Sequence, residues 1–217
     1  MSDPVLSVSG LTITIDGREV VDGLSFELGA GEVLALVGES GCGKTKTAEA
    51  LLGLVPGELG RARADSMRLG DTELTGLDAA GWRSIRGREI SMVFQEPMTA
   101  LDPVFTAGQQ LSRQFRRHRG HSRAQAREAA LEILGRVGIA DSSRVFGSYP
   151  HELSGGMRQR VVIAMAMACQ PRVLVADEPT TALDVTTQAQ VLQQLLDLGK
   201  ETGTGILLIT HDLGVVA

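Results

Sequence analysis

Apolar and polar residues alternate along the N-terminal stretch of the chain. The apolar positions are Val5, Leu6, Val8, Leu11, Ile13 and Ile15, with mostly polar residues between them. Alternation with a period of two predicts antiparallel strands that have one solvated face. Asp16-Gly17 predicts the turn of a hairpin. A second strand pair is expected over residues 20–28, with a turn at residues 29–31.

Three later segments are continuously apolar, namely residues 33–37, 173–176 and 206–209. Such runs are typical of strands that are buried on both faces of a parallel sheet. Helical segments separate them, and we expect helices over residues 44–54, 124–137 and 161–169. The sequence therefore predicts an α/β fold, with helices packed on a mostly parallel sheet and antiparallel strands at the N-terminus.

A glycine-rich segment matches the phosphate-binding pattern G-x-x-x-x-G-K-[ST]. It consists of Gly38, Glu39, Ser40, Gly41, Cys42, Gly43, Lys44 and Thr45. Because it follows a predicted strand and precedes a predicted helix, a chance glycine turn is disfavoured. The glycines let backbone N–H groups point at phosphate oxygens, and the helix dipole adds positive potential. We expect Lys44 to contact the β- and γ-phosphates of ATP, and Thr45 to bind Mg²⁺.

The two cysteines, Cys42 and Cys169, lie far apart in the sequence and have no metal-ligand spacing. Cys42 lies at the start of a predicted helix, where a thiol can become reactive. The simpler interpretation, that Cys42 fills a position for a small residue, is favoured. Cys169 falls in an apolar helical segment and is expected to be an inert core residue.

The second continuously apolar run ends in two carboxylates, Asp177 and Glu178. Ligands of open α/β sheets bind beyond the carboxyl ends of the strands. Asp177 is therefore expected to hold Mg²⁺, and Glu178 to orient the attacking water or accept its proton. Paired acids can also form a solvated corner, but the nearby phosphate-binding pattern disfavours that interpretation.

A second helix start can bind an anion. Ser154, Gly155 and Gly156 precede the apolar helical segment, and a helix N-terminus of this kind exposes backbone N–H groups. The chain thus carries two phosphate-binding helix starts. If the two cannot meet within one subunit, they can meet across two subunits.

Residues 153–160 read L-S-G-G-M-R-Q-R, and this segment resembles the signature motif of the ABC ATPase family. Other family motifs are present: residues 94–97 resemble the Q-loop, 182–184 the D-loop, and Thr210-His211 the switch histidine. The resemblance implies that Gln95 contacts Mg²⁺ or the attacking water, and that His211 contacts the γ-phosphate. It also implies that Ser154, Gly155 and Gly156 reach the ATP bound by a partner subunit.

The resemblance covers essentially the whole chain and implies a P-loop NTPase core with an N-terminal antiparallel β subdomain and an inserted helical subdomain. The nucleotide-binding core would span about residues 1–97 and 158–217, and the helical subdomain about 98–157. Two departures stand out. Ile15 occupies the place of the adenine-stacking aromatic, and family members continue beyond the six residues that follow His211. We expect a shortened chain of this kind to be weakly active alone.

Residues 92–103 and 148–191 are similar to the ATPase subunits of dipeptide, oligopeptide and nickel importers. This branch implies an ATP hydrolase that pairs with an identical or different second ATPase subunit, beneath two transmembrane permeases fed by a substrate-binding protein. Peptide is the expected cargo. The alternatives are an ATPase for nickel or another small solute, or a non-transport ABC ATPase of DNA repair or the ribosome. No coiled-coil insertion or charged linker favours the last alternative.

Composition agrees with a peripheral protein at the cytoplasmic face of the membrane. The net charge is −5, and no apolar run reaches the roughly 18 residues that a bilayer span needs. The N-terminus lacks the pattern of a secretory signal. Residues 113–127 are rich in arginine. A solvated helix face is the favoured interpretation of this basic segment, ahead of contact with a permease loop and of nucleic-acid binding, which we do not expect.

Overall fold

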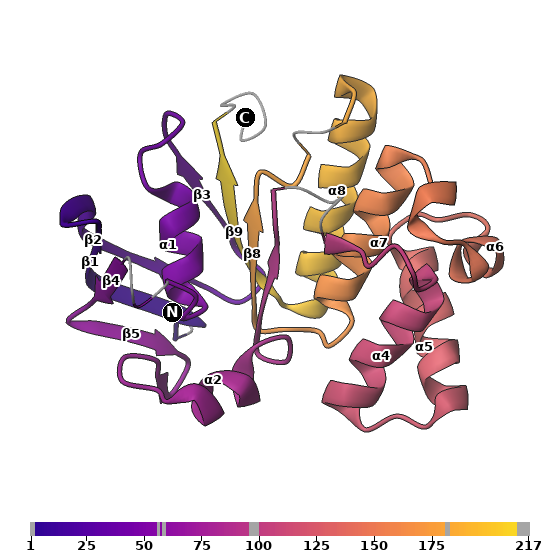
Figure 1. Cartoon of the computed structure of the whole chain (residues 1–217), viewed down its shortest axis with the longest axis horizontal. Helices are drawn as coiled ribbons and strands as arrows, with labels where there is room; N and C mark the ends of the chain where they lie inside the picture. Colours follow the sequence, from indigo (N-terminus) through magenta and orange to yellow (C-terminus); the bar gives the residue numbers. More distant parts are fainter. Residues whose placement is uncertain (1–2, 56, 58–59, 96–99, 181–182, 212–217) are drawn as a thin grey trace.

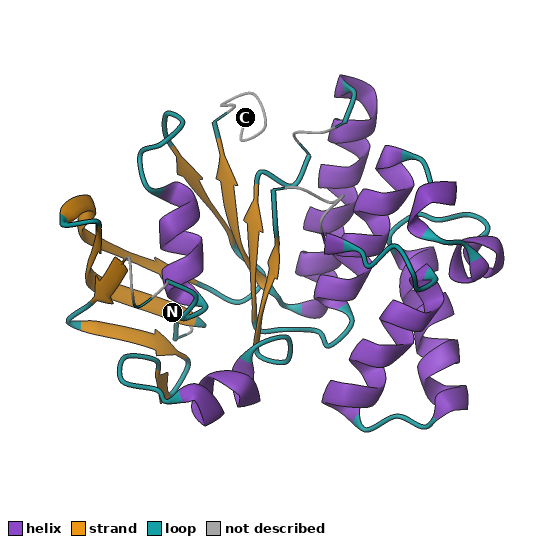
Figure 2. Cartoon of the chain, viewed as in Figure 1, coloured by secondary structure: helices purple, strands orange, loops and turns teal. Residues whose placement is uncertain are grey.

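The computed structural model describes residues 3–55, 57, 60–95, 100–180 and 183–211. Within them the chain forms two sheets, and helices cover both sides of the parallel one (Figures 1 and 2). The α/β fold with an N-terminal antiparallel part is thus confirmed. In this part of the chain, no helix combines the length and apolarity that crossing a membrane requires.

The antiparallel sheet is built around its first strand. β1 (Leu6–Ile15) pairs with β2 (Arg18–Leu28), β4 (Gly60–Arg63) and β5 (Ser66–Leu69), and β5 pairs with β6 (Thr72–Glu73). Asp16-Gly17 forms the predicted turn, with positive φ at both residues.

The expectation of a second strand pair over residues 20–28 is wrong, because these residues belong to the single strand β2. The break in the alternation is a set of register shifts rather than a turn. Gly10 and Gly23 take positive φ at these irregularities, and the Gly10 amide donates to the Ser25 hydroxyl at 2.9 Å. Glycine permits such a bulge, so the strand bends and continues.

The parallel sheet has the order β3-β9-β8-β7, with every pair parallel. Its strands are β3 (Val33–Val37), β7 (Ile90–Val93), β8 (Val173–Asp177) and β9 (Gly205–Thr210). β8 and β9 are buried along their whole length, as the continuous apolar runs predict. β3 is not: Val33 is 43% exposed and Val37 37% exposed, because β3 is the outer strand of the described sheet.

Side chains alternate across the parallel sheet and feed two separate cores. Leu174 and Leu208 pack into the core on one side, and Val175 and Leu207 into the core on the other. The first side carries α4 (Ala107–Arg119), α5 (Arg123–Arg136), α6 (Ser142–Gly147), α7 (Gly155–Met167) and α8 (Val185–Thr202), with the short helix η1 (Pro150–Glu152). The second carries α1 (Lys44–Leu51), α2 (Ala79–Ile85) and the antiparallel sheet.

Helix starts follow the capping residues of the sequence. Thr106 and Ser122 form capping boxes at α4 and α5, while Ser154 caps α7 and Asp184 caps α8. Each side chain accepts a hydrogen bond from a backbone N–H of the first turn, which would otherwise lack a partner. The caps fix where α7 and α8 begin.

Candidate functional site

The glycine-rich segment connects β3 to α1 and curls around the ammonium group of Lys44. Lys44 is 7% exposed, and its Nζ donates to the carbonyl oxygens of Gly38 at 2.6 Å and Glu39 at 2.7 Å. Gly43 has a φ of 96°, and a Cβ there would lie 2.5 Å from the Val20 carbonyl oxygen. A larger residue would therefore push the loop away from β2, so glycine is required at this position.

The remaining loop positions face outward. Glu39, Ser40, Gly41 and Cys42 are exposed, whereas Lys44 is buried at the first position of α1. Cys42 is a free thiol, and its Sγ lies 3.9 Å from Lys44 Nζ. A loop of this form presents backbone N–H groups and one ammonium group to an anion, as phosphate binding requires.

Asp177 ends β8 in a buried position without hydrogen-bond partners. The residue is 1% exposed, and neither carboxylate oxygen has a hydrogen-bond partner that meets distance and angle limits among the described residues. Burial raises the pKa of Asp177; the nearby Thr45 hydroxyl opposes this rise, the Glu178 charge adds to it, and the Lys44 ammonium opposes it. A buried carboxylate without compensation fits a missing cation, and oxygen ligands of this kind suit Mg²⁺.

Glu178 connects three distant parts of the sequence. Gln95 Nε2 donates to Glu178 Oε2 at 3.2 Å, and His211 Nδ1 lies 2.9 Å from Glu178 Oε1. These residues follow β7, β8 and β9, whose carboxyl ends lie at one edge of the parallel sheet. The arrangement places a carboxylate, an amide and an imidazole where the ligands of open α/β sheets bind.

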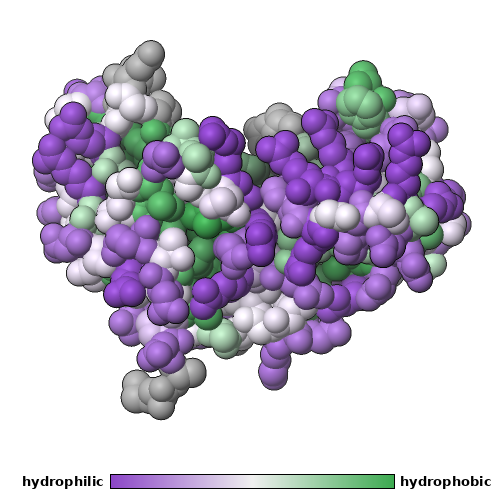
Figure 3. Space-filling model, turned by 90° about the horizontal axis from the view of Figure 1, so that it is seen from below, coloured by the Kyte–Doolittle hydropathy of each residue, from purple (hydrophilic) through white to green (hydrophobic). Residues whose placement is uncertain are grey.

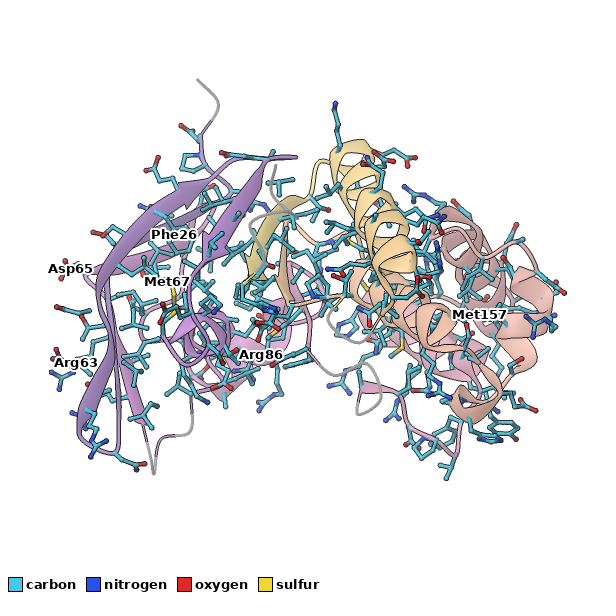
Figure 4. The ribbon with its side chains drawn as sticks, turned by 90° about the horizontal axis from the view of Figure 1, so that it is seen from above. Phe26, Arg63, Asp65, Met67, Arg86 and Met157 are labelled. Atoms are coloured by element: carbon cyan, nitrogen blue, oxygen red, sulfur yellow. The ribbon has the colours of Figure 1, made fainter. Side chains whose placement is uncertain are left out.

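The second helix start lies with α8 rather than with the glycine-rich loop. Ser154 Oγ accepts from the Met157 amide at 3.3 Å, and a Cβ on Gly156 would lie 2.8 Å from Thr187 Cγ2. In Figure 4, Met157 is on the side of the molecule opposite Arg63 of the antiparallel sheet. No described contact joins this helix start to Lys44, so the two anion sites of the chain are separate in the described structure.

Some features of the expected site were not predicted from the sequence, and some lie outside the described residues. The direct contacts of Glu178 with Gln95 and His211 were missed, because strand order rather than any local pattern creates them. Ile15, at the expected adenine position, ends β1 opposite Gly60. Residues 96, 97 and 182 of the expected Q- and D-loops lie outside the described part of the chain.

Comparison with protein families gives a match over most of the chain. The family described as ABC transporter matches residues 21–181, which include the glycine-rich loop, the helix start at Ser154 and the acidic end of β8. This chain belongs to the ABC transporter family.

Curated relatives support the same assignment. The chain is 50% identical to the oligopeptide transport ATP-binding protein AppD of Bacillus subtilis, over 91% of this chain and 60% of that protein. It is 47% identical to the dipeptide transport ATP-binding protein DppD of the same organism, over 99% of this chain and 65% of that protein. The chain thus spans somewhat less than two thirds of the length of these relatives.

A solved ABC cassette has the same fold. The dimeric structure of an ATP-binding cassette in a post-hydrolysis state, bound to ADP and Pi, superposes with a TM-score of 0.82. Its sequence is 28% identical, and the match covers 97% of this chain and 89% of that chain. The architecture of two sheets with helices on both sides of the parallel one is therefore that of an ABC cassette.

Proposed function

We propose that this chain is the ATP-binding and ATP-hydrolysing part of a peptide importer of the ABC type. The observation that carries the proposal is the cluster of Gln95, Glu178 and His211 at one sheet edge, with Asp177 at the end of the same strand as Glu178. Binding alone requires the glycine-rich loop and a cation ligand. A carboxylate held between an amide and an imidazole adds the means to activate water.

Lys44 would hold the β- and γ-phosphates of ATP, exchanging its contacts with the carbonyls of Gly38 and Glu39 for phosphate oxygens. Thr45, Gln95 and Asp177 are the residues that would hold Mg²⁺, which supplies positive charge to the phosphates when bound. The buried carboxylate of Asp177 gains its missing compensation in that state.

Glu178 would orient the attacking water and accept its proton. Gln95 and His211 hold its two carboxylate oxygens, so the group is fixed before substrate arrives. Because phosphoryl transfer depends mainly on positioning and charge stabilisation, a fixed carboxylate can support it with little movement. His211 would in addition contact the γ-phosphate.

A partner ATPase subunit would complete each site. Ser154, Gly155 and Gly156 lie apart from the chain's own glycine-rich loop, so they would serve the nucleotide bound by the partner. Two composite sites would then form between two subunits, identical or different. The dimeric arrangement of the similar solved cassette supports this part of the proposal.

Peptide import is proposed from the relatives. AppD and DppD are described as oligopeptide and dipeptide transport proteins, and each matches nearly the whole of this chain. The subunit would act at the cytoplasmic face of the membrane beneath two permeases, which receive peptide from a substrate-binding protein. Exposed Val104, Phe105 and Tyr149 offer apolar contact area for such a membrane partner.

The decisive test is the Glu178→Gln substitution in the full-length protein with its permeases. We expect Mg²⁺-ATP binding to remain within about twofold, and ATP hydrolysis and peptide uptake to fall by a factor of about 100 or more, because the amide cannot accept a proton. Glu128→Gln, on the exposed side of α5, is the matched control. Wild-type turnover in the Glu178 variant would exclude the proposed role, and turnover without peptide uptake would exclude the proposed cargo.

A further inference from the structure

A cavity of about 790 Å³ opens beside α4, outside the nucleotide site. Five arginines line it: Arg113, Arg116 and Arg117 come from α4, while Arg123 and Arg127 come from α5. Seen from below in Figure 3, hydrophilic side chains cover much of the half of the molecule that carries these helices. The cavity has the size of a small-molecule site.

The five arginines have no acidic partners in the described structure. Arg136 and Arg144, on α5 and α6, do form ion pairs, with Glu201 at 3.1 Å and Asp141 at 3.8 Å. Among the described residues, none of the five cavity arginines lies within ion-pair distance of a carboxylate, and Asp102 is the one acidic residue of the lining. The chain as a whole carries a net charge of −5, so this excess of positive charge is local.

His118, which also lines the cavity, reports the local potential. Burial lowers the pKa of His118, and the positive charges of Arg117 and Arg88 lower it further. An anion in the cavity would act in the opposite direction. His118 is therefore a built-in sensor of anion binding at this place.

The cavity also has an apolar wall. Phe105, Phe146 and Met165 line it, and the Arg127 guanidinium lies 4.7 Å from the centroid of the Phe146 ring. Stacking of this kind holds a guanidinium in place while its N–H groups remain available. Guanidinium groups bind phosphate oxygens through two parallel hydrogen bonds, which favours phosphate over a single-point anion.

We propose that this arginine-lined cavity binds a phosphate-bearing anion, supplied either by a free polyphosphate compound or by the headgroup of an anionic phospholipid. The site shares no lining residue with the glycine-rich loop, so it does not depend on the nucleotide-site assignment. An anion there would neutralise the junction of α4 and α5, the two helices that supply the five arginines.

The test follows the imidazole signals of His118 by NMR while inorganic triphosphate is added. It uses the 217-residue chain with Lys44→Ala, which weakens phosphate binding at the glycine-rich loop. We expect the pKa of His118 to rise on saturation. Arg113→Gln/Arg116→Gln should weaken triphosphate by about tenfold or more through loss of charge-assisted hydrogen bonds. The control Arg61→Gln/Arg63→Gln removes the same charge from exposed β4 and should leave the affinity unchanged.

Two further arms identify the source of the phosphate. Vesicles of phosphatidylglycerol and phosphatidylcholine are compared with vesicles of phosphatidylcholine alone by co-sedimentation of the same variants. Binding to the anionic vesicles that is lost in Arg113→Gln/Arg116→Gln supports the headgroup as the source, and a response to triphosphate alone supports the free compound. No response to either probe, or a response only to a glutamate-rich peptide, would overturn the proposal.

Discussion

Glu178 has a backbone conformation that is unusual for a residue with a side chain. Its φ is 45°, in the left-handed region, and its amide donates to the Ile209 carbonyl at 2.9 Å. That hydrogen bond to the neighbouring strand holds the residue in this conformation. The strain directs the carboxylate toward Gln95 and His211, and a sequence pattern contains no signal for it.

Asp177 makes the ligand-free chain less stable than it could be. Its pKa in the folded state is raised above the unfolded value, chiefly by burial. The folded state therefore holds the proton more tightly, and stability falls as pH rises from about 3.8 through the folded pKa. At neutral pH the buried charge opposes folding unless a cation compensates it.

We therefore expect Asp177→Asn to raise the Tm of the ligand-free chain at neutral pH by about 2 °C or more. The same change should abolish the additional stabilisation that Mg²⁺ gives in the presence of ATP. Differential scanning calorimetry with and without Mg²⁺-ATP measures both effects, and Asp71→Asn, at an exposed position, is the control. A lower Tm together with unchanged Mg²⁺ dependence would contradict the assignment of Asp177 as a cation ligand.

At the residue scale, the sequence indicates which side chains matter but not how they meet. Lys44, Asp177 and His211 follow from a motif or from a strand end. The contacts of Lys44 with Gly38 and Glu39 depend on the curl of the loop, and the contacts of Glu178 depend on the order of three parallel strands. Tertiary arrangement determines both, so local patterns cannot predict them.

At the element scale, the errors of the sequence analysis have a common cause. An apolar run predicts a strand but not its position in the sheet, so β3 was expected to be buried although it is an outer strand of the described sheet. The glycines of β1 and β2 interrupt alternation as a turn would, and only the pairing register identifies a bulge. The strands β4 to β6 are short and have weak patterns, and they were not predicted.

The short connection between β5 and β6 depends on one carboxylate. Burial alone would raise the pKa of Glu73, but hydrogen bonds from Thr75, Met67 and Ser66 outweigh it and lower the pKa from 4.5 to about 2. Because the folded value is depressed, this contribution to stability is complete above pH 4.5 and is lost as pH falls through about 2.

Glu73→Gln is therefore expected to lower the urea midpoint at pH 7 while having less effect near pH 2. The amide keeps the size of the side chain but loses the charge that the three residues stabilise. Urea unfolding at several pH values, compared with Glu128→Gln on the exposed side of α5, measures the difference. An equal loss of stability at both pH values would show that the carboxylate charge is not responsible.

On the scale of the whole molecule, the sheet separates the two anion-binding helix starts. α1 packs into the core shared with the antiparallel sheet, whereas α7 and α8 pack into the other core (Figure 1). The chain therefore presents a phosphate loop and a signature helix that do not contact each other. This separation explains why a single chain would have two half-sites, and it makes the composite-site proposal testable by mixing variants.

Lys44→Ala disables the phosphate loop, and Gly155→Asp places a negative charge at the start of α7. In the proposed arrangement each variant alone forms a dimer with no intact composite site. A mixed dimer contains one intact site, formed by the loop of the Gly155 variant and the signature helix of the Lys44 variant. If identical full-length subunits pair, an equimolar mixture should recover about a quarter of wild-type ATPase activity, because half of the dimers are mixed and each has one working site.

Steady-state ATPase assays on the separate and mixed variants measure this recovery, and adding more of either single variant to itself is the control. Recovery requires that loop and signature helix act across the subunit boundary, since neither variant contains both intact. If exchange of subunits is verified and the mixture stays inactive, sites shared between identical subunits are excluded. Recovery only with a different ATPase chain that supplies an intact signature helix would instead assign the pairing to unlike subunits.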